Sequence, residues 1–174
     1  MKYGRYVSNH ILESIIRPQR PNECAINTVT ETVNILLNTA LNRDDMLTLI
    51  EWNIRDVHEG KMGNADVLDA ITRIGESKRV KINADVFFRQ TNDRLWMELK
   101  HQCLDKQTVL IYHADDHYAL IAGFFEDPDC RYIVLAEHSK ARDPIRVISW
   151  ELLNEQLSVY QGYAVLRVSK KGSV

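Results

Sequence analysis

Cys24 is the residue whose position in the sequence most favours chemistry. It follows a segment that contains Pro18 and Pro21, and it precedes a helical pattern over residues 25–38. Because proline is excluded from helix interiors, the sequence predicts Cys24 at or next to the first helical residue. The unpaired backbone N–H groups of a helix N-terminus lower the pKa of a thiol and can stabilise an oxyanion. Cys24 is therefore a candidate nucleophile.

A thiol nucleophile needs a base within hydrogen-bond reach, and that base needs an acceptor that orients it. Of the six histidines, His117 is placed best, because it heads an apolar strand directly after a turn. Glu137 ends the next strand, so hairpin pairing would bring it near His117, where it could select the ring tautomer. Asp143 is an alternative orienting acid. Gln19, five residues before Cys24, could supply a second oxyanion donor.

Each of these residues also has an ordinary structural interpretation. Free cysteines are mostly small buried hydrophobic residues, and this is how we interpret Cys103 and Cys130. A histidine at a strand start is mostly a surface or capping residue. The segment His113-Ala-Asp-Asp-His117 contains metal-ligand types, but no helical His pair or paired cysteines accompany it, and its aspartates favour a turn. We therefore expect neither a metal site nor a cofactor.

The elements that must position these residues fall into two groups. Helices are predicted over residues 7–16, 25–38, 44–52, 64–75 (capped by Asn64) and 93–103, with an extended segment at 80–88. Short apolar runs follow at 108–112, 118–122, 132–136, 145–147 and 163–168, with one helix at 150–157 that Ser149 opens. Turn-rich gaps at 114–116 and 126–131 fit antiparallel hairpins. Helices followed by an antiparallel sheet favour an α+β fold.

The composition is that of an ordinary globular domain. The chain has 174 residues, 45% of them apolar and 26% charged, which suggests one domain over residues 1–174. A net charge of −2 indicates neither a nucleic-acid nor a membrane partner. Three cysteines without a close pair do not form a disulfide framework, and the first residues lack the apolar core of a signal peptide. We expect a cytoplasmic protein, with signal-independent export as the alternative.

The order of these features along the chain resembles that of the papain-like cysteine peptidases. The resemblance is to the bacterial branch that removes double-glycine leaders from bacteriocin precursors, and to its stand-alone relatives. The matching features are Gln19 before Cys24, the helix 64–75, the strand from His117 to Gly123, the acid Glu137, the helix led by Ser149-Trp150 and the strand led by Gly162-Tyr163. They span about residues 15–168. The resemblance implies a helical lobe that carries the cysteine, packed on an antiparallel sheet that carries the histidine and the acid.

The resemblance also implies roles for single residues. Cys24 would be the nucleophile, His117 the general base, Glu137 the orienting acid and Gln19 an oxyanion donor. The chain departs from the family at three points. Ala25 follows the cysteine where the family has glycine, the glutamine stands five residues before the cysteine where the family has six, and Glu137-His138 replaces Asp-Pro.

The expected function is a cysteine-dependent amide hydrolase that acts on a protein or peptide through an acyl-enzyme. Peptide hydrolysis, deamidation of a protein glutamine and acyl transfer are all open, because the cleft and not the triad selects the acceptor. A catalytically inactive binding module with the same fold is the alternative, which Ala25 and Glu137 favour. A redox sensor would need a resolving cysteine, and no sequence feature brings one to Cys24. The oligomeric state is not determined by the sequence.

Overall fold

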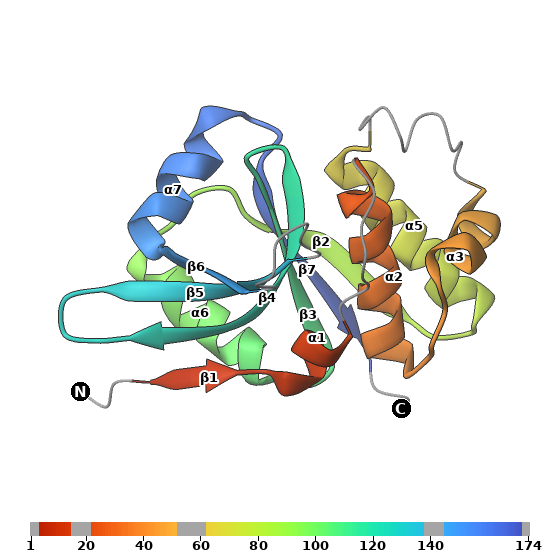
Figure 1. The fold of residues 1–174 in the computed structure, drawn as a ribbon, viewed down its shortest axis with the longest axis horizontal. Helices are drawn as coiled ribbons and strands as arrows, with labels where there is room; N and C mark the ends of the chain where they lie inside the picture. The colour runs from red at the N-terminus through yellow and green to blue at the C-terminus, as the bar shows by residue number, and fades with distance from the viewer. Residues whose placement is uncertain (1–3, 15–21, 52–61, 138–144, 172–174) are drawn as a thin grey trace.

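The computed structural model describes residues 4–14, 22–51, 62–137 and 145–171 of the chain (Figure 1). The helices are α1 (Asn9–Glu13), α2 (Cys24–Leu37), α3 (Arg43–Ile50), α5 (Asn64–Ser77), α6 (Asp93–Leu104) and α7 (Trp150–Val159). The strands are β1 (Arg5–Val7), β2 (Ile82–Phe88), β3 (Thr108–Ala114), β4 (His117–Glu126), β5 (Arg131–Ala136), β6 (Ile145–Ser149) and β7 (Ala164–Lys170). The predicted α+β class is confirmed. No described helix is both long enough and apolar enough to cross a membrane.

The strands form one antiparallel sheet in the order β2-β7-β3-β4-β5-β6, with β1 paired to β4. The late hairpins were predicted, but β1 and β2 also join the sheet from the first half of the chain. The predicted helix over residues 7–16 is wrong at its start, because Val7 belongs to β1 and pairs with Gly123. Ser8 then caps α1 by accepting a hydrogen bond from the Ile11 N–H at 3.3 Å. Pairing with a distant strand overrides the local helical pattern here.

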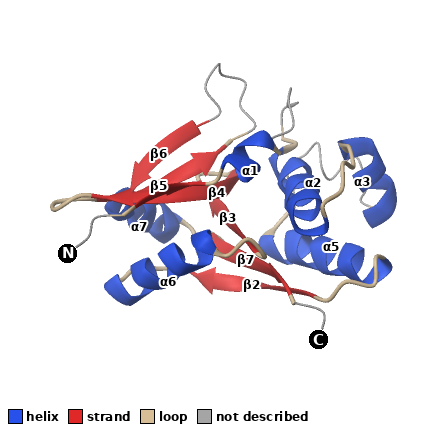
Figure 2. Ribbon diagram, turned by 90° about the horizontal axis from the view of Figure 1, so that it is seen from below, coloured by secondary structure: helices blue, strands red, loops and turns tan. Residues whose placement is uncertain are grey.

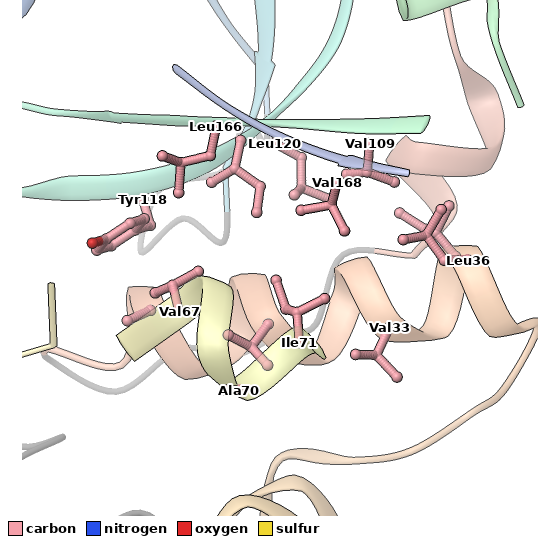
Figure 3. Close-up of a cluster of buried hydrophobic side chains, with 14 of the residues drawn as sticks. Val33, Leu36, Val67, Ala70, Ile71, Val109, Tyr118, Leu120, Leu166 and Val168 are labelled. Atoms are coloured by element: carbon pink, nitrogen blue, oxygen red, sulfur yellow. The ribbon is translucent and has the colours of Figure 1, made fainter. Parts of the chain in front are cut away.

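Helices cover both faces of the sheet. In Figure 2, α2, α3 and α5 lie on one side, and α6 and α7 lie on the other. Side chains alternate along β4 accordingly: Tyr118 and Leu120 enter the core with α2 and α5, whereas Ala119 and Ile121 enter the core with α6 and α7. Figure 3 shows the first of these cores, where residues of β3, β4 and β7 face residues of α2 and α5. The sheet therefore has two distinct buried surfaces.

Helix α2 is the central helix of the first core. The residues Ile26, Val29, Val33 and Leu36 recur at helical spacing and are buried against the sheet and α5. Its outer face is also buried, including Asn27 and Glu31, so that eleven of its fourteen residues lie inside the protein. A helix that is buried on all sides has little freedom to shift. Its first residue, Cys24, is therefore held in a fixed position relative to the strands.

Substitution of Gly123 by alanine should destabilise the protein strongly. A Cβ atom at this position would overlap the carbonyl oxygen of Tyr6, because β1 pairs with β4 here and its backbone passes close to Gly123. We expect a loss of about 2–3 kcal/mol in the free energy of unfolding, measured by urea denaturation, since backbone cannot move aside as a flexible side chain can. Gly63→Ala is the control, because a Cβ there meets only the Asp66 carboxylate at 3.6 Å. Equal unfolding midpoints for the two variants would contradict the close packing of β1.

Candidate active site

Cys24 is the first residue of α2, as predicted. Two residues before Cys24, Asn22 has a φ of 62°, a left-handed conformation that asparagine tolerates. Glu23 occupies the N-cap position, but its side chain does not cap the helix. The Glu23 carboxylate, only 2% exposed, instead accepts two hydrogen bonds from Arg43 Nη1, at 2.8 and 3.0 Å. This ion pair ties the start of α2 to α3 and neutralises a negative charge next to the thiol.

Burial controls the acidity of Cys24. Desolvation raises the pKa of the Cys24 thiol, and it outweighs the backbone N–H groups of Tyr118, Ala25 and Cys24 itself, which favour the thiolate. The prediction that the helix N-terminus lowers this pKa is therefore wrong in its net direction. The predicted helix N–H groups are present, but Cys24 is partly buried against the first core, and this desolvation has the larger effect on its pKa. At neutral pH the Cys24 thiol is therefore mostly protonated, and a base is needed to form the nucleophilic thiolate.

The contact with Tyr118 brings Cys24 to the start of β4. The Tyr118 N–H that favours the thiolate belongs to the peptide bond that joins His117 to Tyr118. The backbone of His117 consequently lies beside the Cys24 sulfur. The start of β4 therefore lies beside the first residue of α2, although the two are far apart in the sequence.

His117 and Glu137 also approach each other, as predicted from the hairpin. Leu120 pairs with Ala136 in the β4–β5 ladder, so that Glu137 follows opposite Ala119, diagonally across from His117. His117 Nε2 lies 4.0 Å from Glu137 Oε1. This separation is within ion-pair range but longer than a hydrogen bond. The acid is thus close enough to stabilise a protonated imidazole electrostatically.

Arg146 is a member of the site that the sequence interpretation missed. It lies on β6 opposite Leu135, and its Nε is 2.7 Å from Glu137 Oε1. Its guanidinium group also lies over the ring of Tyr112, 5.4 Å from the centroid. The alternation of residues along β5 and β6 could have indicated this pairing, but only once the two strands were known to be neighbours. Arg146 is therefore an ion-pair partner of the carboxylate that faces His117.

A pocket of about 230 Å³ opens beside Cys24. It is lined by Asn22, Cys24, Ala25, Met62, His113, Asp116 and Tyr118. His113, which had no predicted role, comes from β3 and stacks flat on the Tyr118 ring, with centroids 3.9 Å apart and planes 3° apart. His113 therefore shares a pocket with the candidate nucleophile.

The turn between β3 and β4 shapes one side of this pocket. Asp115 and Asp116 have φ of 56° and 51°, as expected for a two-residue hairpin of type I′, and the predicted turn is confirmed. The Tyr163 hydroxyl donates to Asp116 Oδ1 at 2.6 Å and accepts from the Asp116 N–H at 2.9 Å. These bonds tie the turn to the residue that precedes β7. The Asp116 carboxylate is thereby held at the pocket.

Asn64, the first residue of α5, links this helix to the residues beside the pocket. Gly63 occupies the N-cap position of α5, so the prediction that Asn64 caps this helix is wrong. The Asn64 amide instead donates to the Gly162 carbonyl at 2.6 Å and accepts from the Tyr118 hydroxyl at 3.1 Å. The side chain that resembles a cap in the sequence is used to join α5 to the two strands next to the site.

The other candidates do not add to this cluster. Gln19, His138 and Asp143 lie outside the described residues. Within the described ranges, no group of three or more His, Cys, Asp or Glu side chains is arranged to hold a metal ion. All three cysteines are free thiols, and burial raises the pKa of the Cys103 thiol to about 12.

No protein-family model matches the chain, and no curated protein matches it.

Proposed function

We propose that this protein is a cysteine-dependent amide hydrolase with a papain-like arrangement of its helical layer and sheet, acting on a protein or peptide. The observation that carries the proposal is the junction of three elements. The Tyr118 N–H faces the Cys24 sulfur, and His117, the residue before Tyr118, has its ring 4.0 Å from Glu137. These contacts support Cys24 at the start of α2 as nucleophile, His117 at the start of β4 as base and Glu137 directly after β5 as acid.

The raised pKa of Cys24 favours a mechanism that starts from a protonated thiol. His117 removes the thiol proton as the sulfur attacks the carbonyl carbon, so that a C–S bond forms and the carbonyl oxygen becomes negative. The Glu137 carboxylate stabilises the imidazolium, and Arg146 holds that carboxylate in place. His117 then gives its proton to the leaving nitrogen as the C–N bond breaks. The product of this half-reaction is a thioester on Cys24.

Water completes the cycle. His117 takes a proton from a water molecule, the hydroxide adds to the thioester carbonyl, and the C–S bond breaks to release the carboxylic acid and the thiol. The oxyanion in both steps is stabilised by backbone N–H groups in the first turn of α2, where the N-cap residue Glu23 makes no side-chain cap hydrogen bond. We assign the second donor to the Gln19 amide, as the family resemblance implies.

Acylation with p-nitrophenyl acetate tests this function directly. Cys24 should form an acetyl thioester at pH 7 at least about tenfold faster than Cys130, as located by mass spectrometry of peptides. His117→Ala should slow acylation of Cys24 about a hundredfold. In that variant the rate should follow the thiolate and keep rising with pH beyond the point where the wild-type rate levels off, because burial raises the Cys24 pKa. His101→Ala, an exposed position on α6, is the control.

Two results would count against the enzyme. The first is acylation of Cys24 that is no faster than acylation of Cys130, and the second is an unchanged rate and pH profile of Cys24 acylation in His117→Ala. Either result would favour the second candidate function, a papain-like binding module without catalysis. Specific observations favour that candidate: Glu137 lies nearer to Arg146, at 2.7 Å, than to His117, at 4.0 Å, and burial disfavours the thiolate.

A further inference from the structure

Arg146 has a second contact besides Glu137, and that contact is with Tyr112. Tyr112 lies on β3 and its side chain is fully buried. The Arg146 guanidinium lies over the Tyr112 ring, 5.4 Å from the centroid, and donates a hydrogen bond to the Tyr112 hydroxyl. A guanidinium has N–H donors and no acceptor, so the tyrosine oxygen is the acceptor of this bond. Tyr112 therefore contacts Arg146 with both its ring and its hydroxyl.

The hydroxyl proton of Tyr112 is used in a bond to helix α7. The hydroxyl donates it to Gln156 Oε1 at 2.9 Å. Burial raises the pKa of Tyr112, so that the hydroxyl keeps this proton at neutral pH. Because a hydroxyl has a single proton, the bond to Gln156 leaves the oxygen lone pairs for Arg146. Gln156 thereby orients the hydroxyl that holds the guanidinium.

The register of the sheet brings these side chains together. Tyr112 pairs with Ala119 in the β3–β4 ladder, and Arg146 pairs with Leu135 in the β5–β6 ladder. Tyr112, Ala119 and Leu135 all belong to the second core, on the side of the sheet where α6 and α7 lie (Figure 2). Because paired residues share a face of a sheet, Arg146 lies on that side too. Residues of β3 and β6 thus meet Gln156 of α7.

This chain of contacts ends at the candidate acid and base. Arg146 Nε lies 2.7 Å from Glu137 Oε1, and the same oxygen lies 4.0 Å from His117 Nε2. The carboxylate charge favours the protonated imidazole, and the guanidinium charge opposes it. The position of Arg146 therefore determines how much of the Glu137 charge acts on His117.

The orientation of the guanidinium leaves part of its bonding capacity unused. Arg146 Nη2 is buried and has no hydrogen-bond partner among the described residues. Pairs of arginine and carboxylate are strongest when two N–H groups meet two oxygens. The bond to the Tyr112 hydroxyl opposes a rotation of the guanidinium into that arrangement. Without the hydroxyl, Arg146 can turn and neutralise Glu137 more completely.

Other charged and titratable groups also lie near these residues. Asp115 acts electrostatically on the Tyr112 hydroxyl, and Asp116 directly precedes His117 in the turn before β4. From α2 the Cys24 thiol approaches the start of β4, and α7 contributes a neutral amide. The two aspartates and the thiol are left intact when residues of β3, β6 or α7 are changed, so that differences between such variants report on the network itself.

We propose that Tyr112 and Gln156 are positioning residues, which hold Arg146 in a fixed orientation against Glu137 and thereby set the basicity of His117. The proposal rests on the function proposed above, since it takes His117 as the base. Neither residue touches the reacting atoms. Through them, helix α7 takes part in the site.

Tyr112→Phe tests the proposal, because it keeps the ring under the guanidinium and removes only the hydroxyl. The pKa of His117 is measured by NMR titration of its imidazole signals. We expect the acid dissociation constant of His117 to rise about threefold, because Arg146 then takes a larger share of the Glu137 charge. The acid limb of p-nitrophenyl acetate hydrolysis should move to lower pH by the same factor. Tyr132→Phe, a strand tyrosine that stacks on Phe125, is the control and should leave both unchanged.

A double variant shows whether the effect passes through Arg146. In an Arg146→Met background, Tyr112→Phe should leave the pKa of His117 unchanged, because the guanidinium that the hydroxyl orients is absent. Gln156→Met should act in the same direction as Tyr112→Phe, with Gln102→Met on α6 as its control. Gln156 is only partly buried, so that this variant gives the same information where Tyr112→Phe does not fold. An unchanged or raised pKa of His117 in the single variants, or an equal shift in the Arg146→Met background, would overturn the proposal.

The NMR titration needs no turnover, so that it separates this proposal from the proposed function. A lowered pKa of His117 that depends on Arg146 supports the positioning roles even if Cys24 forms no thioester with p-nitrophenyl acetate. Acylation of Cys24 together with an unchanged pKa of His117 in Tyr112→Phe and Gln156→Met would overturn the positioning roles and leave the hydrolase intact.

Discussion

Replacing Cys24 with alanine is expected to reduce the hydrolysis of p-nitrophenyl acetate by about 10⁴-fold or more, because the thioester cannot form. His117 and Glu137 cannot compensate, since a general base alone gives only a small part of the rate in a site that acts as a unit. The fold should tolerate the change, because alanine differs from cysteine only by the loss of the sulfur. Steady-state release of p-nitrophenolate measures the effect.

Cys24→Ser and Cys130→Ala complete this experiment. Serine keeps a hydroxyl within reach of the same base but is a much weaker nucleophile, so that the variant should retain a slow acylation that alanine lacks. Cys130 lies in the turn before β5, away from the pocket, and its removal should leave the rate unchanged. If Cys24→Ala hydrolyses the ester as fast as the wild type, the reaction does not pass through this thiol.

The second large effect is expected at Glu137. Glu137→Gln keeps the shape of the side chain but removes the charge that faces both His117 and Arg146. We expect kcat to fall about a hundredfold, because the imidazolium formed during attack loses its counter-charge next to a cationic guanidinium. The acid limb of the rate profile should move to lower pH, since loss of a nearby carboxylate makes a histidine easier to deprotonate. Glu98→Gln, on the exposed side of α6, is the control.

Arg146→Met should shift the pH profile of the rate in the direction opposite to Glu137→Gln. It tests whether the Glu137 carboxylate sets the pH at which His117 loses its proton. Without the guanidinium, Glu137 faces His117 alone, so that the acid limb of the rate profile should move to higher pH. Arg94→Met is the matched control, because Arg94 forms an exposed pair with Glu98 on α6. If Glu137→Gln and Arg146→Met leave the profile unchanged, the orienting acid lies elsewhere, and Asp143 becomes the candidate.

Much of the architecture could be predicted because its signals are local. Prolines end the loop before α2, apolar residues at spacings of three and four mark its buried stripe, and two aspartates in succession suit the type I′ turn before His117. The hairpin of β4 and β5 follows from adjacent apolar runs. These features depend on residues close together in the chain, so the sequence by itself predicted that Cys24, His117 and Glu137 are candidates in this order.

The properties that decide the chemistry arise from contacts between distant residues. Partial burial reverses the expected shift in the pKa of Cys24, and the register of β6 brings Arg146 to Glu137. The pairing of β3 with β4 places His113 in the pocket. Desolvation and register depend on which strands become neighbours, and no local pattern encodes that choice. The sequence thus determined which residues are candidates for the chemistry, and only the tertiary structure decided the protonation of the thiol, the partner of the acid and the residues that line the pocket.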